Sequence, residues 1–177
     1  TIPLDIVTDE QLEDRVEAML GDGKKHHIVL LSLMDFLRAR GKSDIAKASR
    51  SASLILTSSK MVVFGAKFLR HQELSRYMPF DFVIRVLSIL EKRGRSVYLI
   101  GTRPGYLQTA SSNLRGSFPG LQIVGRCAGY FPTSHEENIL LAIKKASPSL
   151  LLAGKGLPGK ERWLLSHKKH FATGLTL

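Results

Sequence analysis

Glycine-rich turns carry the residues whose types and spacing could do chemistry in this chain. The segment 101–105 (GTRPG) follows an apolar strand predicted at 97–100. A strand predicted at 121–124 ends in Gly125 and leads to a second turn, 129–131 (GYF). In an open parallel sheet, ligands bind at the carboxyl ends of the strands, and backbone amides at a helix start suit a phosphate. The turns therefore predict a nucleotide-type site.

A further turn, 154–159 (GKGLPG), precedes a helix that we expect Pro158 to begin. Its glycine spacing fits neither a P-loop nor a dinucleotide fingerprint. The turn could hold a phosphate or a polar sugar, and the alternative is an ordinary strand-to-helix connection with Trp163 in the core. We expect the three turns to converge on one cleft.

Few side chains are placed to act as a nucleophile, a base or a metal ligand. Ser58 follows a strand predicted at 54–57, where a serine is either a nucleophile or a helix cap. Asp35 and Asp81 are the acids near predicted strand ends or helix starts that could act as a base. The six histidines show no metal-ligand spacing, and the single cysteine cannot build a thiolate site. We therefore expect no metal site and no cofactor.

Strand-like and helical segments alternate along the whole chain, which predicts an α/β fold with an open, mostly parallel, Rossmann-like sheet and helices on both faces. Apolar runs and amphipathic spacing predict the elements. The predicted strands are 28–32, 54–57, 97–100, 121–124, 150–153 and 171–177. The predicted helices are 10–20, 35–50, 60–69, 80–93, a helix-like segment between the 101–105 turn and the 121–124 strand, 134–145 and one begun by Pro158. We expect one domain, 1–177, with further residues beyond Leu177 because the chain stops inside a predicted strand.

Charge and composition bear on partners and location. The formal charge is +11, concentrated in residues 24–50 and 155–169. Such an excess suits nucleic acid, an anionic membrane face or phosphorylated substrates, and the alternative is a solvated basic surface. Nucleic acid is not expected, because aromatic residues near the basic ones are sparse and no motif is visible. One cysteine, no signal peptide and no apolar run near the roughly 20 residues of a membrane span predict a cytoplasmic protein.

Several segments together resemble the WecG/TagA/CpsF glycosyltransferase family. The similarity covers nearly the whole chain, and the order and spacing of its last segments are the specific part. The matching segments are 2–5 (IPLD), 28–32, 101–105, 118–125 (FPGLQIVG), 129–131 (GYF) and the turn Gly156-x-Pro158-x-x-Glu161-x-Trp163.

The resemblance implies transfer of an amino sugar, such as N-acetylmannosamine, from a UDP donor to a polyprenyl-diphosphate-linked sugar at the cytoplasmic membrane face. It implies a metal-independent, inverting reaction in which an aspartate takes the proton of the acceptor hydroxyl. Backbone amides and cations would stabilise the leaving diphosphate. The binding residues that it implies are Ser32, Arg76, Gly101, Thr102, Arg103, Gly125, Gly129, Tyr130, Phe131, Gly156, Pro158, Lys160 and Glu161.

The chain departs from the family pattern on the sugar and acceptor side. Ser32 stands where members carry an asparagine, and Ser58 stands where they carry the proposed catalytic aspartate. Lys160 replaces a glutamine, whereas Arg76 matches. A neutral hydroxyl is a poor proton acceptor near neutral pH, so Ser58 is not expected to act as the base.

These departures predict a degenerate member that keeps the fold and a UDP-sugar-type pocket but has lost or greatly weakened transferase activity. It would act as a binding or scaffold protein, with a protein partner or an anionic membrane surface, peripheral to the inner face of the membrane. The alternatives are an active transferase in which Asp35 is the relocated base, and a nucleic-acid or anionic-surface binder. The sequence leaves the oligomeric state open, and a homo-oligomer is among the options.

Overall fold

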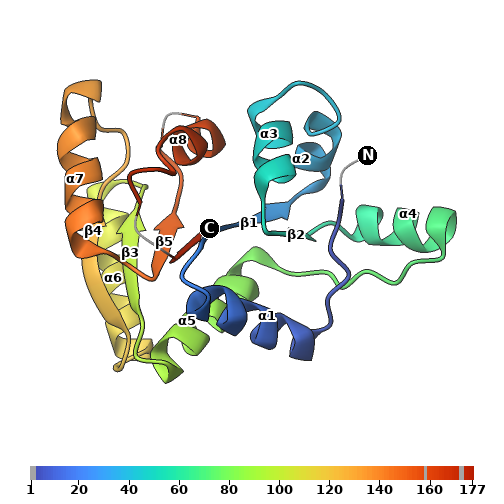
Figure 1. Ribbon diagram of the computed structural model, residues 1–177, viewed down its shortest axis with the longest axis horizontal. Coiled ribbons are helices and arrows are strands. Elements are labelled where there is room, and N and C mark those ends of the chain that lie inside the picture. Colours follow the sequence, from blue (N-terminus) through green and yellow to red (C-terminus); the bar gives the residue numbers. More distant parts are fainter. Residues whose placement is uncertain (1–2, 158, 172–173) are drawn as a thin grey trace.

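Apolar strands form an open sheet in which every pair of neighbours is parallel (Figure 1). The computed structural model describes residues 3–157, 159–171 and 174–177. Within them the sheet has six strands in the order β2-β1-β6-β5-β3-β4. The strands are β1 (Lys25–Leu31), β2 (Leu54–Thr57), β3 (Ser96–Ile100), β4 (Gln122–Cys127), β5 (Leu150–Ala153) and β6 (Gly174–Thr176). The predicted α/β fold with a parallel sheet is confirmed.

Serine and threonine caps set where several helices begin. Thr8 and Gln11 form a reciprocal capping box at α1, and Ser43 and Ser59 accept bonds from amides in the first turns of α3 and α4. The helices are α1 (Asp9–Gly21), α2 (Leu33–Arg38), α3 (Asp44–Ser51), α4 (Lys60–Arg70), α5 (Pro79–Lys92), α6 (Pro104–Ser117), α7 (Glu136–Ala146) and α8 (Lys160–Ser166), with a short 3₁₀ helix, η1 (Thr133–His135).

Alternation along the strands builds a core on each face of the sheet. Val97 and Leu99 pack in the cluster that includes buried residues of α1 and α5, whereas Tyr98 and Ile100 pack with residues of α7 and α8. A third cluster joins Val29 of β1 to α3. Because successive strand residues point to opposite faces, both faces are apolar and both are covered by helices.

The last strand lies in the middle of the sheet, between β1 and β5. It is short, and it pairs with β1 from Lys25 to His27. Strand β1 continues to Leu31, where its other edge pairs with β2. The carboxyl half of β1 therefore reaches beyond β6, and this leaves room between β1 and β5 at the edge where ligands bind in parallel sheets.

Some predicted boundaries differ from those in the structure. The helix predicted at 35–50 is two helices, because Ser43 caps a new start at Asp44. The strand predicted at 171–177 spans Gly174–Thr176, and residues 172–173 lie outside the described part of the chain. Pro158, expected to begin the last helix, also lies outside it, and α8 begins at Lys160.

Strand β4 is longer than predicted and contains Gly125 in its interior. The strand runs to Cys127, and its register with β3 shifts between Val97 and Tyr98. A Cβ on Gly125 would overlap Cε2 of Tyr98, far inside van der Waals contact. Gly125 is therefore needed to let the Tyr98 ring lie across the bulge, and its predicted place at the end of the strand was wrong.

Candidate functional site

The start of α2 places a carboxylate at the carboxyl end of β1. Ser32 Oγ donates to Asp35 Oδ2 at 2.6 Å, and Asp35 N donates back to Ser32 Oγ at 3.2 Å. Ser32 N also donates to Asp35 Oδ2, at 3.2 Å. This reciprocal capping holds both side chains directly after the strand. Asp35 is therefore held at the edge of the sheet. Its Oδ2 atom accepts hydrogen bonds from both the backbone N and the Oγ of Ser32.

Ser58 lies beside this position at the end of β2. Its backbone N and its Oγ are 3.0 and 3.4 Å from the carbonyl oxygen of Leu31, the residue before Ser32. Arg76 Nε donates to the carbonyl oxygen of Ser58 at 2.8 Å, and Arg76 pairs with Thr57 in an isolated parallel bridge. Ser59, one residue on, is the cap of α4. The structure thus brings Ser32, Ser58 and Arg76 together, although they come from three segments.

A cleft of about 230 Å³ lies between β1 and β5, beyond the end of β6. Its walls are mostly apolar, with Asp35 from α2 and Lys160 from α8 also lining it. His27 of β1 lines the same cleft. Opposite charges on two helices that face one opening can orient a polar ligand and stabilise charge on it. Sequence reasoning named Asp35 and Lys160 separately, and only the tertiary structure places them in one cleft.

The glycine turns are joined to one another by backbone hydrogen bonds. Thr102 N donates to Lys155 O, and Gly129 N donates to Thr102 O at 2.8 Å. Tyr130 N donates to Gly156 O at 2.7 Å. The turns therefore meet at one edge of the sheet, as expected. Gly129 lines a shallow hollow beside α7, and Ala153, the last residue of β5 before the third turn, lines the β1–β5 cleft. That the three turns share one cleft stays a prediction.

The aromatic pair of the second turn divides between surface and core. Tyr130 is 68% exposed, and its ring lies against Gly156, where a Cβ would come within 2.7 Å of the ring. Phe131 is half-buried and meets the Trp163 ring edge-on at 6.3 Å. Tyr130 is therefore available to a ligand, while Phe131 packs with the core. Arg103 is exposed and begins α6 without a side-chain cap, which leaves the first amides of that helix to solvent or to an anion.

Trp163 is a core residue with one polar partner that the sequence did not reveal. It is 4% exposed, and its Nε1 donates to Glu136 Oε1 of α7 at 2.5 Å. The expectation that Trp163 packs in the core is confirmed. Glu161, on the same helix, has no described side-chain surroundings, so its predicted binding role stays a prediction.

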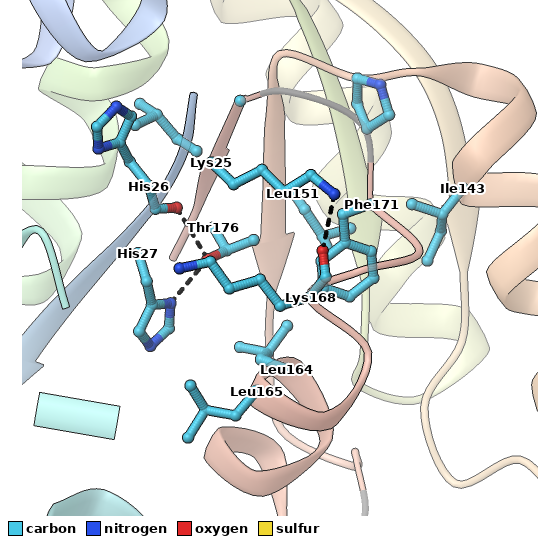
Figure 2. Close-up of a pocket in the computed structure, with 13 residues that line it drawn as sticks. Lys25, His26, His27, Ile143, Leu151, Leu164, Leu165, Lys168, Phe171 and Thr176 are labelled. Atoms are coloured by element: carbon cyan, nitrogen blue, oxygen red, sulfur yellow. Dashed lines mark hydrogen bonds between the residues drawn. The ribbon is translucent and has the colours of Figure 1, made fainter. Parts of the chain in front are cut away.

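His27 is a buried polar group that sequence reasoning did not single out. Its Nδ1 is 2.7 Å from Thr176 Oγ1, and that hydroxyl donates to the carbonyl oxygen of His26 (Figure 2). The hydroxyl hydrogen is thus used, so Nδ1 carries the proton that it donates, while Nε2 has no partner among the described residues. Burial, together with the charges of Lys160 and Lys168, lowers the pKa of His27 to about 4.

No group of three or more His, Cys, Asp or Glu side chains in the described part of the chain is placed to hold a metal ion. Across those same residues, no helix has both the length and the apolar character needed to cross a bilayer.

Comparison with known proteins decides the family. The model of the glycosyl transferase WecG/TagA/CpsF family matches residues 1–177. The chain belongs to this family. The N-acetylglucosaminyldiphosphoundecaprenol N-acetyl-beta-D-mannosaminyltransferase of Bacillus subtilis (strain 168) is 21% identical over 129 residues, which are 72% of this chain and 49% of that protein. The protein of the same name from Staphylococcus aureus (strain NCTC 8325 / PS 47) is 23% identical over 120 residues, 68% of this chain and 46% of that protein. The chain spans about half the length of these curated relatives.

Proposed function

We propose that this chain binds a UDP-sugar-type ligand at the carboxyl edge of its sheet and has lost or greatly weakened the transferase activity of its family. The observation that carries the proposal is the pairing of Ser58 with the carbonyl oxygen of Leu31, at the position where the family resemblance puts a catalytic aspartate. Attack of an acceptor hydroxyl on the sugar C1 requires a group that takes its proton. A serine hydroxyl beside a carbonyl oxygen acts as a donor there and does not supply that base.

The nucleotide side of the site supports retained binding. The turns around Thr102, Gly129 and Gly156 are tied together by backbone bonds, and the exposed start of α6 lies next to them. Lys160 adds a positive charge to the wall of the β1–β5 cleft, where a diphosphate would gain from it. A bound nucleotide could then serve the chain as a ligand that controls binding of a protein partner or an anionic membrane surface.

An active transferase is the second candidate, and the position of Asp35 favours it. The Asp35 carboxylate lines the same cleft as Lys160. In that case Asp35 would take the acceptor proton while Lys160 stabilises the leaving diphosphate. The hydrogen bonds from Ser32 to Asp35 Oδ2 weigh against it, because they already occupy the carboxylate oxygen that would accept the proton.

Transfer from UDP-N-acetylmannosamine or UDP-N-acetylglucosamine to an N-acetylglucosamine-diphospholipid separates the two candidates. We expect no turnover by the wild type, and turnover in Ser58→Asp that exceeds it by roughly 10²–10⁴-fold, the usual worth of a general base. Ser59→Asp is the matched control, because it adds the same charge one residue away at a helix-cap position that tolerates aspartate. Robust wild-type turnover that Asp35→Asn abolishes would overturn the proposal in favour of the second candidate.

Calorimetry with UDP tests the binding half of the proposal separately. We expect heat of binding at millimolar UDP with the wild-type protein, and a weaker response with Lys160→Gln, because one cation is removed from the cleft wall. Folded protein without a response at that concentration would mean that the nucleotide site is vestigial.

A further inference from the structure

Helix α4 exposes most of its large apolar side chains. Val62 is its one buried residue, although the whole helix is described. Met61, Phe64, Phe68 and Leu69 are each 64–77% exposed, and the rings of Phe64 and Phe68 stack at 6.2 Å. Figure 1 shows α4 projecting beyond the β2 edge, away from β3, β4 and β5. An exposed apolar cluster of this kind marks a surface that another body covers.

The apolar surface continues onto α2. Leu33, Met34 and Leu37 of α2 are 40–56% exposed. A groove of about 680 Å³ runs between α4 and the α2–α3 pair, with Phe36, Val62 and Leu74 among the residues that line it. Helices α2 and α4 begin directly after β1 and β2, so this surface lies at the same edge of the sheet as the candidate site.

Positive charge surrounds the apolar surface. Between residues 33 and 72 the chain has eight Lys and Arg side chains and two Asp, which gives this part of the chain more than half of the net charge of +11. Arg40, Arg50 and Arg70 line the groove, and Lys60 and Lys67 flank Phe64 at helical spacing. Lys67 pairs with Glu73 at 3.1 Å, but both side chains are well exposed, so the pair is weak.

We propose that α4 and the adjoining face of α2 dock on an anionic phospholipid bilayer. Phe64 and Phe68 would enter the boundary between headgroups and acyl chains, while the surrounding Lys and Arg side chains contact lipid phosphates. The charge argues for lipid over a second copy of this chain, because two such faces would repel each other. Docking through this surface would place the β1–β5 cleft close to the membrane surface. The docking does not depend on whether a sugar is transferred in the cleft.

A tryptophan reporter tests insertion directly. In Phe68→Trp, we expect the emission to shift to the blue and to be quenched by brominated lipid in vesicles of phosphatidylglycerol and phosphatidylcholine. Trp163 is buried at 4% exposure and provides a constant background. Tyr106→Trp is the matched control, because Tyr106 is 69% exposed on α6, away from the docking surface, and its signal should not change. Quenching that is equal in the two variants, or absent from both, would overturn the proposal.

Vesicle sedimentation separates the apolar and the charged contributions. Phe64→Ser with Phe68→Ser should lower the partition coefficient roughly a hundredfold, because each phenylalanine contributes roughly tenfold when it leaves water. Lys60→Gln with Arg70→Gln should lower it roughly fivefold per removed charge, whereas Lys144→Gln with Lys145→Gln on α7 should have a smaller effect. If the wild type bound neutral vesicles as strongly as anionic ones, the proposal would be contradicted. It would also be contradicted if the wild type formed a concentration-dependent dimer without lipid and the two serine substitutions abolished that dimer.

Discussion

His27 makes the stability of this protein depend on pH between about 6.5 and 4. The imidazole is 5% exposed, and its Nδ1–H is used on Thr176 Oγ1. A second proton would go to Nε2, which has no partner among the described residues, and it would add charge near Lys160 and Lys168. These causes lower the pKa of His27 from 6.5 to about 4. We therefore expect acid to destabilise the protein already as the pH falls below 6.5.

The sign and the size follow from proton linkage. Below pH 6.5 the unfolded chain binds a proton at His27, whereas the folded chain binds it only when the pH falls to about 4. Stability is therefore complete above pH 6.5 and is lost as the pH falls toward 4. With these two pKa values the loss is about 2 kcal/mol at pH 5 and about 3 kcal/mol once the pH is below both.

Urea denaturation at pH 7.5 and pH 5.0 measures the effect, when the wild type is compared with His27→Asn. Asparagine keeps a donor near the Nδ1 position but does not titrate, so the variant should lose about 2 kcal/mol less than the wild type between the two pH values. His135→Asn is the control, because His135 is exposed in η1, and it should keep the wild-type dependence. If His27→Asn and the wild type lost equal stability, the buried neutral imidazole would be refuted.

Two further predictions concern stability. Gly101 has a φ of +119°, and a Cβ there would lie 2.8–2.9 Å from the backbone of Gly154. Gly101→Ala should therefore lower the free energy of unfolding by about 2 kcal/mol or more. In the same urea titration, Gly105→Ala should change little, because Gly105 is exposed at the start of α6. Tyr77 Oη donates to the carbonyl oxygen of Val7 at 2.8 Å in a buried position, so Tyr77→Phe should cost about 1–2 kcal/mol; the exposed Tyr106→Phe should cost almost nothing, and equal midpoints for the two variants would contradict the assignment.

Most of the strands could be predicted from the sequence because they contain a short apolar run bounded by polar or glycine-rich segments. Local chemistry also fixed several helix starts, since a serine cap acts on amides two or three residues away. The resemblance also implies that Ser58 stands at the position of the proposed catalytic aspartate, and that inference needs only the position of one residue after a strand. The helix predicted at 35–50 failed because apolar spacing continued across the Ser43 cap, and the cap decided the boundary.

Longer-range features came only from the tertiary structure. The placement of β6 between β1 and β5 depends on pairing between segments at opposite ends of the chain. That pairing leaves open the cleft that both Asp35 and Lys160 line. The role of Gly125 depends on the Tyr98 ring of the neighbouring strand. Helix α4 gives the clearest case. Its apolar spacing predicted a helix correctly, but the same spacing is compatible with an apolar face that is buried and with one that is exposed. Which of the two it is depends on what the rest of the fold packs against it, and here the fold leaves Phe64 and Phe68 uncovered.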